Sequence, residues 1–109
     1  MAKVIFILHR RADQTREQCL EHWRGDRHTS IVKNVPGLSR WVQNHVNSTS
    51  APAAPDGVGE LWFDSQAALE QALSSPQMAA AIEDARNFLD MEATQMVIVE
   101  EKPAYDPRP

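Results

Sequence analysis

The stretch Val58–Phe63, VGELWF, carries apolar side chains at alternating and at neighbouring positions. Residues of a β-strand alternate between the two faces of a sheet, so Leu61 and Phe63 share one face. The other face carries Val58, Glu60 and Trp62. Both faces therefore have apolar area to bury. Helices can cover one face. The other face can be buried against the sheet of a second copy, so the pattern predicts a homodimer with a barrel-like interior. A monomer with an open ligand-binding face is the alternative.

Three further segments have the composition of strands. They are Val4–Leu8, Leu38–Val46 and Gln95–Glu101. Two helical regions separate these strands. The first begins at a capping box formed by Thr15 and Gln18, breaks at Gly25, where Asp26 can cap a second segment, and ends at Pro36-Gly37.

The second helical region begins at Asp64 or Ser65 and restarts at Ser75-Pro76, a cap followed by proline at the first helical position. Its expected buried face carries Ala79, Ile82, Ala85 and Leu89. The order strand, helix, strand, strand, helix, strand predicts one α+β domain over residues 1–102, followed by a Pro-rich tail over 103–109.

The bulk composition excludes several classes of function. The 109 residues include 42% hydrophobic and 24% charged residues, with a net charge of -4, an ordinary globular mixture. A nucleic-acid surface needs clustered Lys and Arg, and Arg10-Arg11 is too short to provide one. The single Cys19 excludes zinc motifs of the CxxC type and lies on an apolar helical face, so we expect it in the core. No stretch approaches a membrane span, and we expect a cytoplasmic location.

The four histidines are the first candidates for chemistry, because histidine titrates near neutral pH. We expect His9 at a solvated strand end and His22 on an exposed helical face. His28 differs, since it shares an apolar helical stripe with Ile31, Val32 and Val35. An imidazole that faces inward needs a partner or a cavity.

Two strands carry further candidates. Ser39, Trp41, Gln43 and His45 share one face of the second strand, and Leu38 and Arg40 lie on the other. An apolar platform with converging polar groups has the composition of a pocket wall. In the third strand a buried Glu60 must pair, accept hydrogen bonds or become protonated. It could orient a histidine, or it could be a structural carboxylate.

Four segments together resemble the EthD family of the dimeric α+β barrel superfamily. They are Glu21–Arg24 leading to His28, Val35–Asn44, Gly59–Asp64 and Asn87–Asp90. The resemblance implies a ferredoxin-like fold whose sheets pair into a barrel, with a pocket between sheet and helices. It also implies that His28, eight residues before Pro36, acts in this pocket. Trp41 matches a substrate-facing aromatic position that is tyrosine in a lactone isomerase of the family, so no proton transfer is carried over to it.

These observations predict a lyase or isomerase, of the dehydratase or cyclase type, that acts without a metal or other cofactor on an aromatic, lactone or polyketide-like molecule. His28 would be the general acid and base, and Glu60 or His45 would orient it or bind a substrate oxygen. The residues expected to contact the substrate are Trp41, Gln43, Trp62 and Phe88. The alternatives are a non-catalytic binding protein for the same kind of ligand, and a haem-binding barrel.

Overall fold

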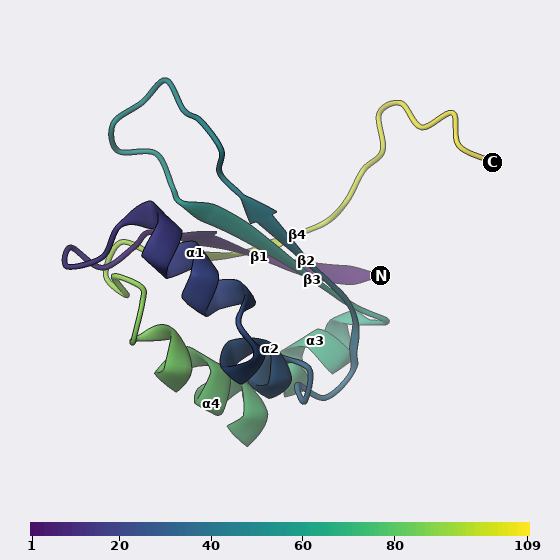
Figure 1. Ribbon diagram of the computed structural model, residues 1–109. Helices are drawn as coiled ribbons and strands as arrows, with labels where there is room; N and C mark the ends of the chain where they lie inside the picture. Colours follow the sequence, from purple (N-terminus) through teal and green to yellow (C-terminus); the bar gives the residue numbers. More distant parts are fainter.

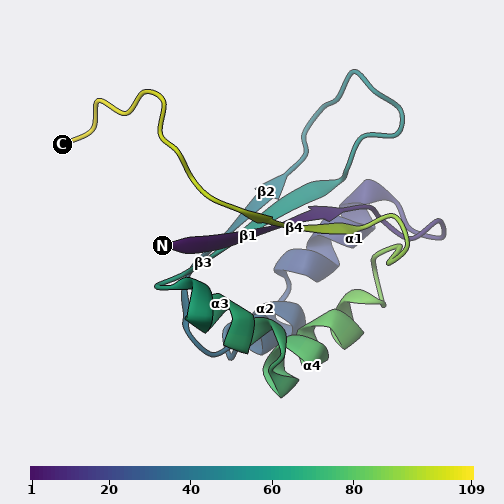
Figure 2. The same ribbon diagram turned by 180° about the vertical axis from the view of Figure 1, so that it is seen from behind.

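Four antiparallel strands form one sheet, and four short helices lie against one of its faces (Figures 1 and 2). The structure is a computed structural model that describes residues 1–109. The strands are β1 (Ala2–Leu8), β2 (Leu38–His45), β3 (Gly57–Phe63) and β4 (Gln95–Val99). The helices are α1 (Arg16–Arg24), α2 (Asp26–Val32), α3 (Gln66–Leu73) and α4 (Pro76–Ala85). The strand order is β2-β3-β1-β4, so the first and third strands lie in the centre.

Most helix boundaries follow the caps read from the sequence. The Thr15 side chain accepts from the backbone of Gln18 and the Gln18 side chain accepts from Thr15, which completes the capping box of α1. Ser65 caps α3, and Ser75 caps α4 with Pro76 at its first position. One cap is corrected. Asp26 is the first residue of α2, and Gly25 precedes it without a side-chain hydrogen bond.

The register of β2 departs from simple alternation. A bulge between Leu38 and Arg40 places Leu38 opposite Phe63 and Arg40 opposite Trp62. Leu38 therefore lies on the helix-covered face, not with Arg40 as alternation predicts, because the extra residue of a bulge shifts the side chains that follow. Trp41 pairs with Leu61 on the same covered face.

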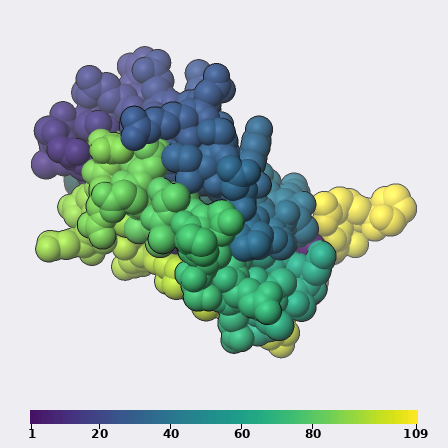
Figure 3. Space-filling view, turned by 90° about the horizontal axis from the view of Figure 1, so that it is seen from below, coloured from purple at the N-terminus to yellow at the C-terminus, as the bar shows by residue number.

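The covered face holds the hydrophobic core, which forms two clusters. The larger is built around Val4, Leu61, Phe63 and Leu69, and the smaller around Trp23 and Phe88. Phe6 contacts both clusters. Seen from the helical side, α2 and α4 lie next to each other and close this face of the domain (Figure 3).

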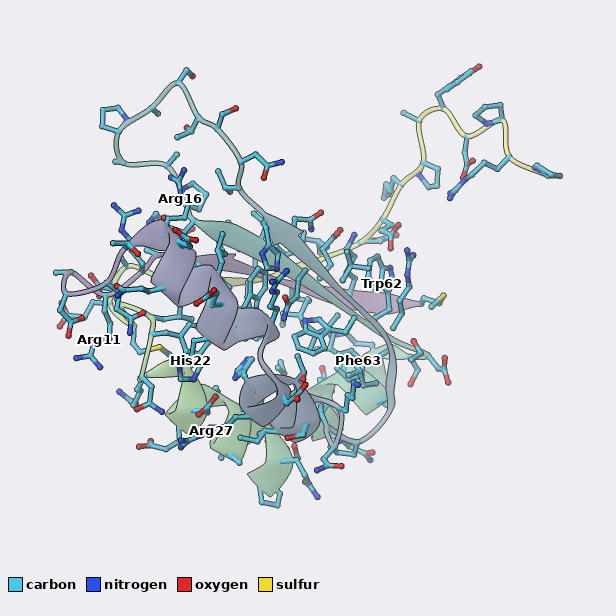
Figure 4. The ribbon with its side chains drawn as sticks, viewed as in Figure 1. Arg11, Arg16, His22, Arg27, Trp62 and Phe63 are labelled. Carbon is cyan, nitrogen blue, oxygen red and sulfur yellow. The ribbon has the colours of Figure 1, made fainter.

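The other face of the sheet has no covering element in the chain. Its apolar side chains are half-buried or exposed: Ile5, Ile7, Val42, Val58, Val97 and Val99. Trp62 lies on this face, between the charged ends of Lys3 and Arg40, whereas Phe63 points into the core (Figure 4). The two-sided character predicted from Val58–Phe63 is thus present in the fold.

The buried face of α4 differs from the predicted one. Met78, Ala81, Asp84 and Ala85 are buried, whereas Ala79 is exposed. The helix ends at Ala85, and Leu89 is buried in the turn that follows. Met78 and Ala81 belong to the larger core cluster and Ile82 packs against it, so the packing of α4 against the core decides which positions are buried.

The strand β4 lies at one edge of the sheet, and the tail follows it. β4 ends at Val99, two residues before the predicted end, and the tail runs away from the sheet (Figure 2). The helical layer leaves β4 uncovered, so Met96 and Ile98 remain about half exposed at 49% and 47%. None of the helices is long and apolar enough to cross a lipid bilayer.

Candidate functional site

A cavity of about 80 Å³ lies between the sheet and the helices α2 and α4, where the two core clusters meet. Of its 17 lining residues 14 are hydrophobic. The two polar side chains in the wall are His28 and Thr94. Any hydrogen bonding or proton transfer to a bound molecule therefore depends on very few groups.

The His28 side chain comes from the first turn of α2 and is 5% exposed. Its Nδ1 lies 2.9 Å from Oδ2 of Asp84. A carboxylate only accepts hydrogen bonds, so this contact places the imidazole proton on Nδ1 and leaves Nε2 with a free lone pair. Nε2 makes no hydrogen bond within the chain, and His28 is one of the residues that line the cavity.

Burial lowers the pKa of His28 below its ordinary value of 6.5, and the hydrogen bond to Asp84 opposes this shift only in part. The imidazole is therefore neutral at pH 7. A neutral imidazole with Nε2 free is the form that can accept a proton.

Asp84 is the centre of a polar cluster between α1, α2 and α4. Its carboxylate is buried and lies 3.0 Å from Arg27 Nε, and the Asn87 side chain donates to it at 3.3 Å. His22 and Arg27 point into this region from α1 and α2 (Figure 4). Burial raises the pKa of Asp84, but the hydrogen bonds that its carboxylate accepts from His28 and Asn87 lower it, and the pKa lies below its usual range. Asp84 is therefore the ionised partner that orients His28.

Aromatic rings form the walls beside His28. The edge of the His28 ring approaches Phe88 at 5.1 Å and Trp41 at 6.3 Å between ring centroids. Trp23 closes another side, because its indole lies directly against Gly57 and Gly59 of β3. A Cβ atom at Gly57 would lie 2.6 Å from the Trp23 ring, so the two glycines make room for this wall.

Gln43 and His45 lie on the covered face of β2 but do not line the cavity. Gln43 donates to the backbone oxygen of Trp23 at 3.0 Å, and His45 Nε2 lies 2.8 Å from Gln43 Oε1. The His45 ring stacks on Trp23 with a centroid distance of 5.1 Å. Of the predicted wall of Trp41, Gln43 and His45, the structure brings only Trp41 to His28, because Trp23 stands between the cavity and the other two.

Glu60 and Trp62 lie on the uncovered face, across the sheet from His28. Glu60 forms an ion pair with Lys3 Nζ at 2.6 Å and accepts from the Asn44 side chain at 2.9 Å. The hydrogen bond from Lys3 lowers the pKa of Glu60, so the carboxylate is charged. The expectation that Glu60 or His45 orients His28 is therefore corrected: Asp84 does so.

Two residues of the site were missed from the sequence: Asp84, which contacts His28, and Thr94, which lines the cavity. The signal for Asp84 was its place beside Met78, Ala81 and Ala85 on one helical stripe, where an acid among apolar residues needs a partner. His22 was expected to be exposed, but its ring is half-buried and stacks on Phe88 at 4.4 Å.

Two other predictions concern reactive groups. Cys19 lies in the core as expected, and burial raises the pKa of its thiol to about 11. No three His, Cys, Asp or Glu side chains converge in a way that could hold a metal ion.

Comparison with known proteins identifies a protein family whose model matches most of this chain. A family model described as the EthD domain matches residues 11–92. An uncharacterized 11.0 kDa protein of Rhodococcus erythropolis, from the thcB-thcC intergenic region, is 28% identical over 82 residues, which cover 74% of this chain and 79% of that protein.

Solved structures share the fold at low identity. An ethyl tert-butyl ether d (EthD) family protein of Bacillus halodurans superposes with a TM-score of 0.75 at 19% identity and covers 94% of this chain and 100% of that one. A dimeric ferredoxin-like protein of unknown function from Bacteroides fragilis gives 0.65 at 13% identity, with 92% and 95% covered. SnoaB, a cofactor-independent oxygenase from Streptomyces nogalater, gives 0.65 at 12% identity, with 99% and 100% covered. The ferredoxin-like α+β fold predicted from the sequence is confirmed.

Proposed function

Because this chain belongs to the EthD family, we propose that its cavity performs cofactor-independent acid–base chemistry on a small, mostly apolar carbonyl compound, as a lyase or isomerase. The observation that carries the proposal is the pairing of His28 Nδ1 with the buried Asp84, which leaves Nε2 as a base at an apolar cavity. The proposed substrate is an aromatic, lactone or polyketide-like carbonyl compound. SnoaB, which shares the fold, is described as a cofactor-independent oxygenase, and this supports catalysis without a cofactor on this fold.

The reaction follows from the position of the lone pair. His28 Nε2 removes a proton from a carbon next to the carbonyl group, and the electron pair of the C–H bond moves onto the carbonyl oxygen. Asp84 stabilises the imidazolium that forms. The electron pair then returns from the oxygen and the C=O bond re-forms. In a substrate with a C=C bond next to the acidic carbon, the imidazolium gives the proton to the far carbon of that bond, which is isomerisation. In a substrate with a hydroxyl group on the β-carbon, the C–O bond breaks as the imidazolium protonates the departing hydroxyl, which is dehydration.

The cavity limits the size of the substrate. About 80 Å³ is smaller than the roughly 150 Å³ of an engineered cavity that binds benzene. A ring can enter if the flexible side chains of Met78 and Met91 in the wall move aside. A haem group is several times larger than one aromatic ring and does not fit this cavity, so the haem-binding alternative has no support from the geometry.

We propose further that two copies pair through the uncovered face of the sheet. The support is its apolar side chains, which include Ile7, Val42 and Val58, and the dimeric state of the Bacteroides fragilis protein with the same fold. Light scattering at micromolar concentration is expected to give twice the mass of one chain. Val58→Lys, which places a charge on this face, is expected to give a single chain with an unchanged circular dichroism spectrum. A single-chain mass for the unaltered protein contradicts the pairing.

Exchange of carbon-bound hydrogen tests the catalytic proposal without knowledge of the natural substrate. The protein is incubated in D₂O with a panel of small ketones and lactones, and deuterium uptake next to the carbonyl group is followed by NMR. We expect His28→Gln to lower the exchange rate by about 10²–10⁴-fold, the usual contribution of general acid–base catalysis. His9→Gln is the matched control, because the His9 side chain does not line the cavity.

The outcomes separate the proposal from a binding protein with the same cavity. If a compound binds, and His28→Gln weakens its binding although the unaltered protein exchanges no proton, the chain binds without turnover. If exchange proceeds equally in His28→Gln, His28 is not the base.

A further inference from the structure

Thr94 is the second polar side chain in the wall of the cavity, after His28. It directly precedes β4, and its backbone N–H donates to the oxygen of Asp90 at 2.9 Å. Its position has the same parity as Met96, which pairs with Phe6, so the Thr94 side chain lies on the side of the sheet that carries the cavity it lines.

The hydroxyl group of Thr94 accepts a hydrogen bond within the chain but does not donate one. Its Oγ1 accepts the backbone N–H of His9 at 3.2 Å, which uses a lone pair of the hydroxyl. The hydroxyl proton has no acceptor within the chain. A hydroxyl carries one donor and two acceptor positions, so its proton remains available to a guest that reaches Thr94 in the cavity wall.

We propose that the Thr94 hydroxyl donates a hydrogen bond to the carbonyl oxygen of the ligand and thereby selects small cyclic ketones and lactones over hydrocarbons of the same shape. This inference deepens the proposed function. Thr94 would hold the carbonyl oxygen of the substrate, and His28 Nε2 would take the proton from the carbon next to that carbonyl. A hydrogen bond to this oxygen also stabilises the negative charge that develops there on proton removal. The inference rests on the proposed site, but not on turnover.

A pair of matched compounds tests the selection. Cyclopentanone and methylenecyclopentane share one ring and one shape and differ in C=O against C=CH₂. Binding is measured by NMR titration of the indole signals of Trp23 and Trp41, which line the cavity. One net hydrogen bond corresponds to roughly 2- to 10-fold tighter binding of the ketone. Thr94→Val is expected to remove this preference by weakening the ketone alone, and Thr94→Ser is expected to keep it.

A measurement on the unaltered protein covers the case in which Thr94→Val does not fold. Donation from the hydroxyl to a ligand strengthens its acceptance from His9, because linked hydrogen bonds polarise one another. The His9 amide proton should therefore shift downfield with cyclopentanone and not with methylenecyclopentane. Equal binding of the two compounds, no binding of the ketone, or a preference that survives in Thr94→Val overturns the inference.

The His28→Gln variant separates this inference from the proposed function. It should lose proton exchange yet retain the preference for the ketone, because binding needs the Thr94 donor and not the base. If exchange is unaffected in His28→Gln while Thr94→Val loses the preference, the catalytic role fails and the role of Thr94 stands. If the preference persists in Thr94→Val while His28→Gln loses exchange, the role of Thr94 fails and the catalytic role of His28 stands. In that case the indole N–H groups of Trp23 and Trp41, two residues that line the cavity, are the next donors to test.

Discussion

Replacing Asp84 by asparagine removes the charge on which the candidate site is built. In the folded protein the carboxylate binds His28 Nδ1 at 2.9 Å in a buried position and Arg27 Nε at 3.0 Å. A hydrogen bond to a charged group contributes about 1.5–3 kcal/mol. The Arg27 side chain is 74% exposed, so its ion pair is screened by solvent and adds only about 0–1 kcal/mol. Asp84→Asn should therefore lower the free energy of unfolding by about 2–4 kcal/mol.

Two assays measure this change. With a urea dependence of about 1–3 kcal/mol per molar, the midpoint of unfolding should fall by roughly 0.7–4 M. The imidazole nitrogen shifts should report a second effect, because the asparagine amide can donate to Nδ1 and move the imidazole proton to Nε2. Proton exchange should then fall by up to about 10⁴-fold, the loss seen when the aspartate of a Ser-His-Asp triad becomes asparagine.

The neighbouring acid supplies the control for this prediction. Glu83 is exposed and pairs only with Arg86, so Glu83→Gln should change stability by less than about 0.5 kcal/mol. The reasoning is refuted if Asp84→Asn is as stable as Glu83→Gln and His28 keeps its proton on Nδ1.

Three other predictions follow from the core and the wall. The folded pKa values of His28 and His45 lie below 6.5, so the unfolded chain binds more protons just below that pH, and stability should fall as the pH drops from 7 to 5. Urea unfolding across this range should show the fall, and His28→Gln should flatten it except for the part due to His45. Gly57→Ala should cost about 1–3 kcal/mol in thermal unfolding, because the new methyl group displaces Trp23; an unchanged stability would show that the indole moves freely. Cys19, with a pKa of about 11, should react with a thiol reagent only after unfolding, and rapid labelling of the folded protein would contradict its burial.

The strands and caps could be predicted from the sequence because they depend on neighbouring residues. Alternation in Val58–Phe63 and the capping box at Thr15 are local patterns, and both are present in the fold. The predictions failed where an inserted residue or tertiary packing shifts a pattern. The bulge after Leu38 returned that side chain to the covered face, and on α4 the packing buries Met78 and Ala81 and leaves Ala79 exposed.

The candidate site could be predicted only in part. His28 could be singled out because an imidazole on an apolar helical stripe faces inward and then needs a hydrogen-bond partner or a cavity. Its partner was misassigned to Glu60 or His45, because alternation separates Glu60 from Leu61 but does not say on which face His28 lies. The same local reasoning could not show that Trp23 would shield His45 from the cavity.

The sequence by itself determined the order of the elements, the two-sided sheet and the place of His28 on an inward stripe, since each follows from spacing over a few residues. Only the tertiary structure decided that Asp84, 56 positions away, meets His28. That contact depends on how α2 packs against α4 over the sheet, which no periodicity within either helix records. The uncovered face predicted from Val58–Phe63 lies across the sheet from this site. One side of this strand therefore packs in the core, and its other side forms part of the surface where we propose that a second copy binds.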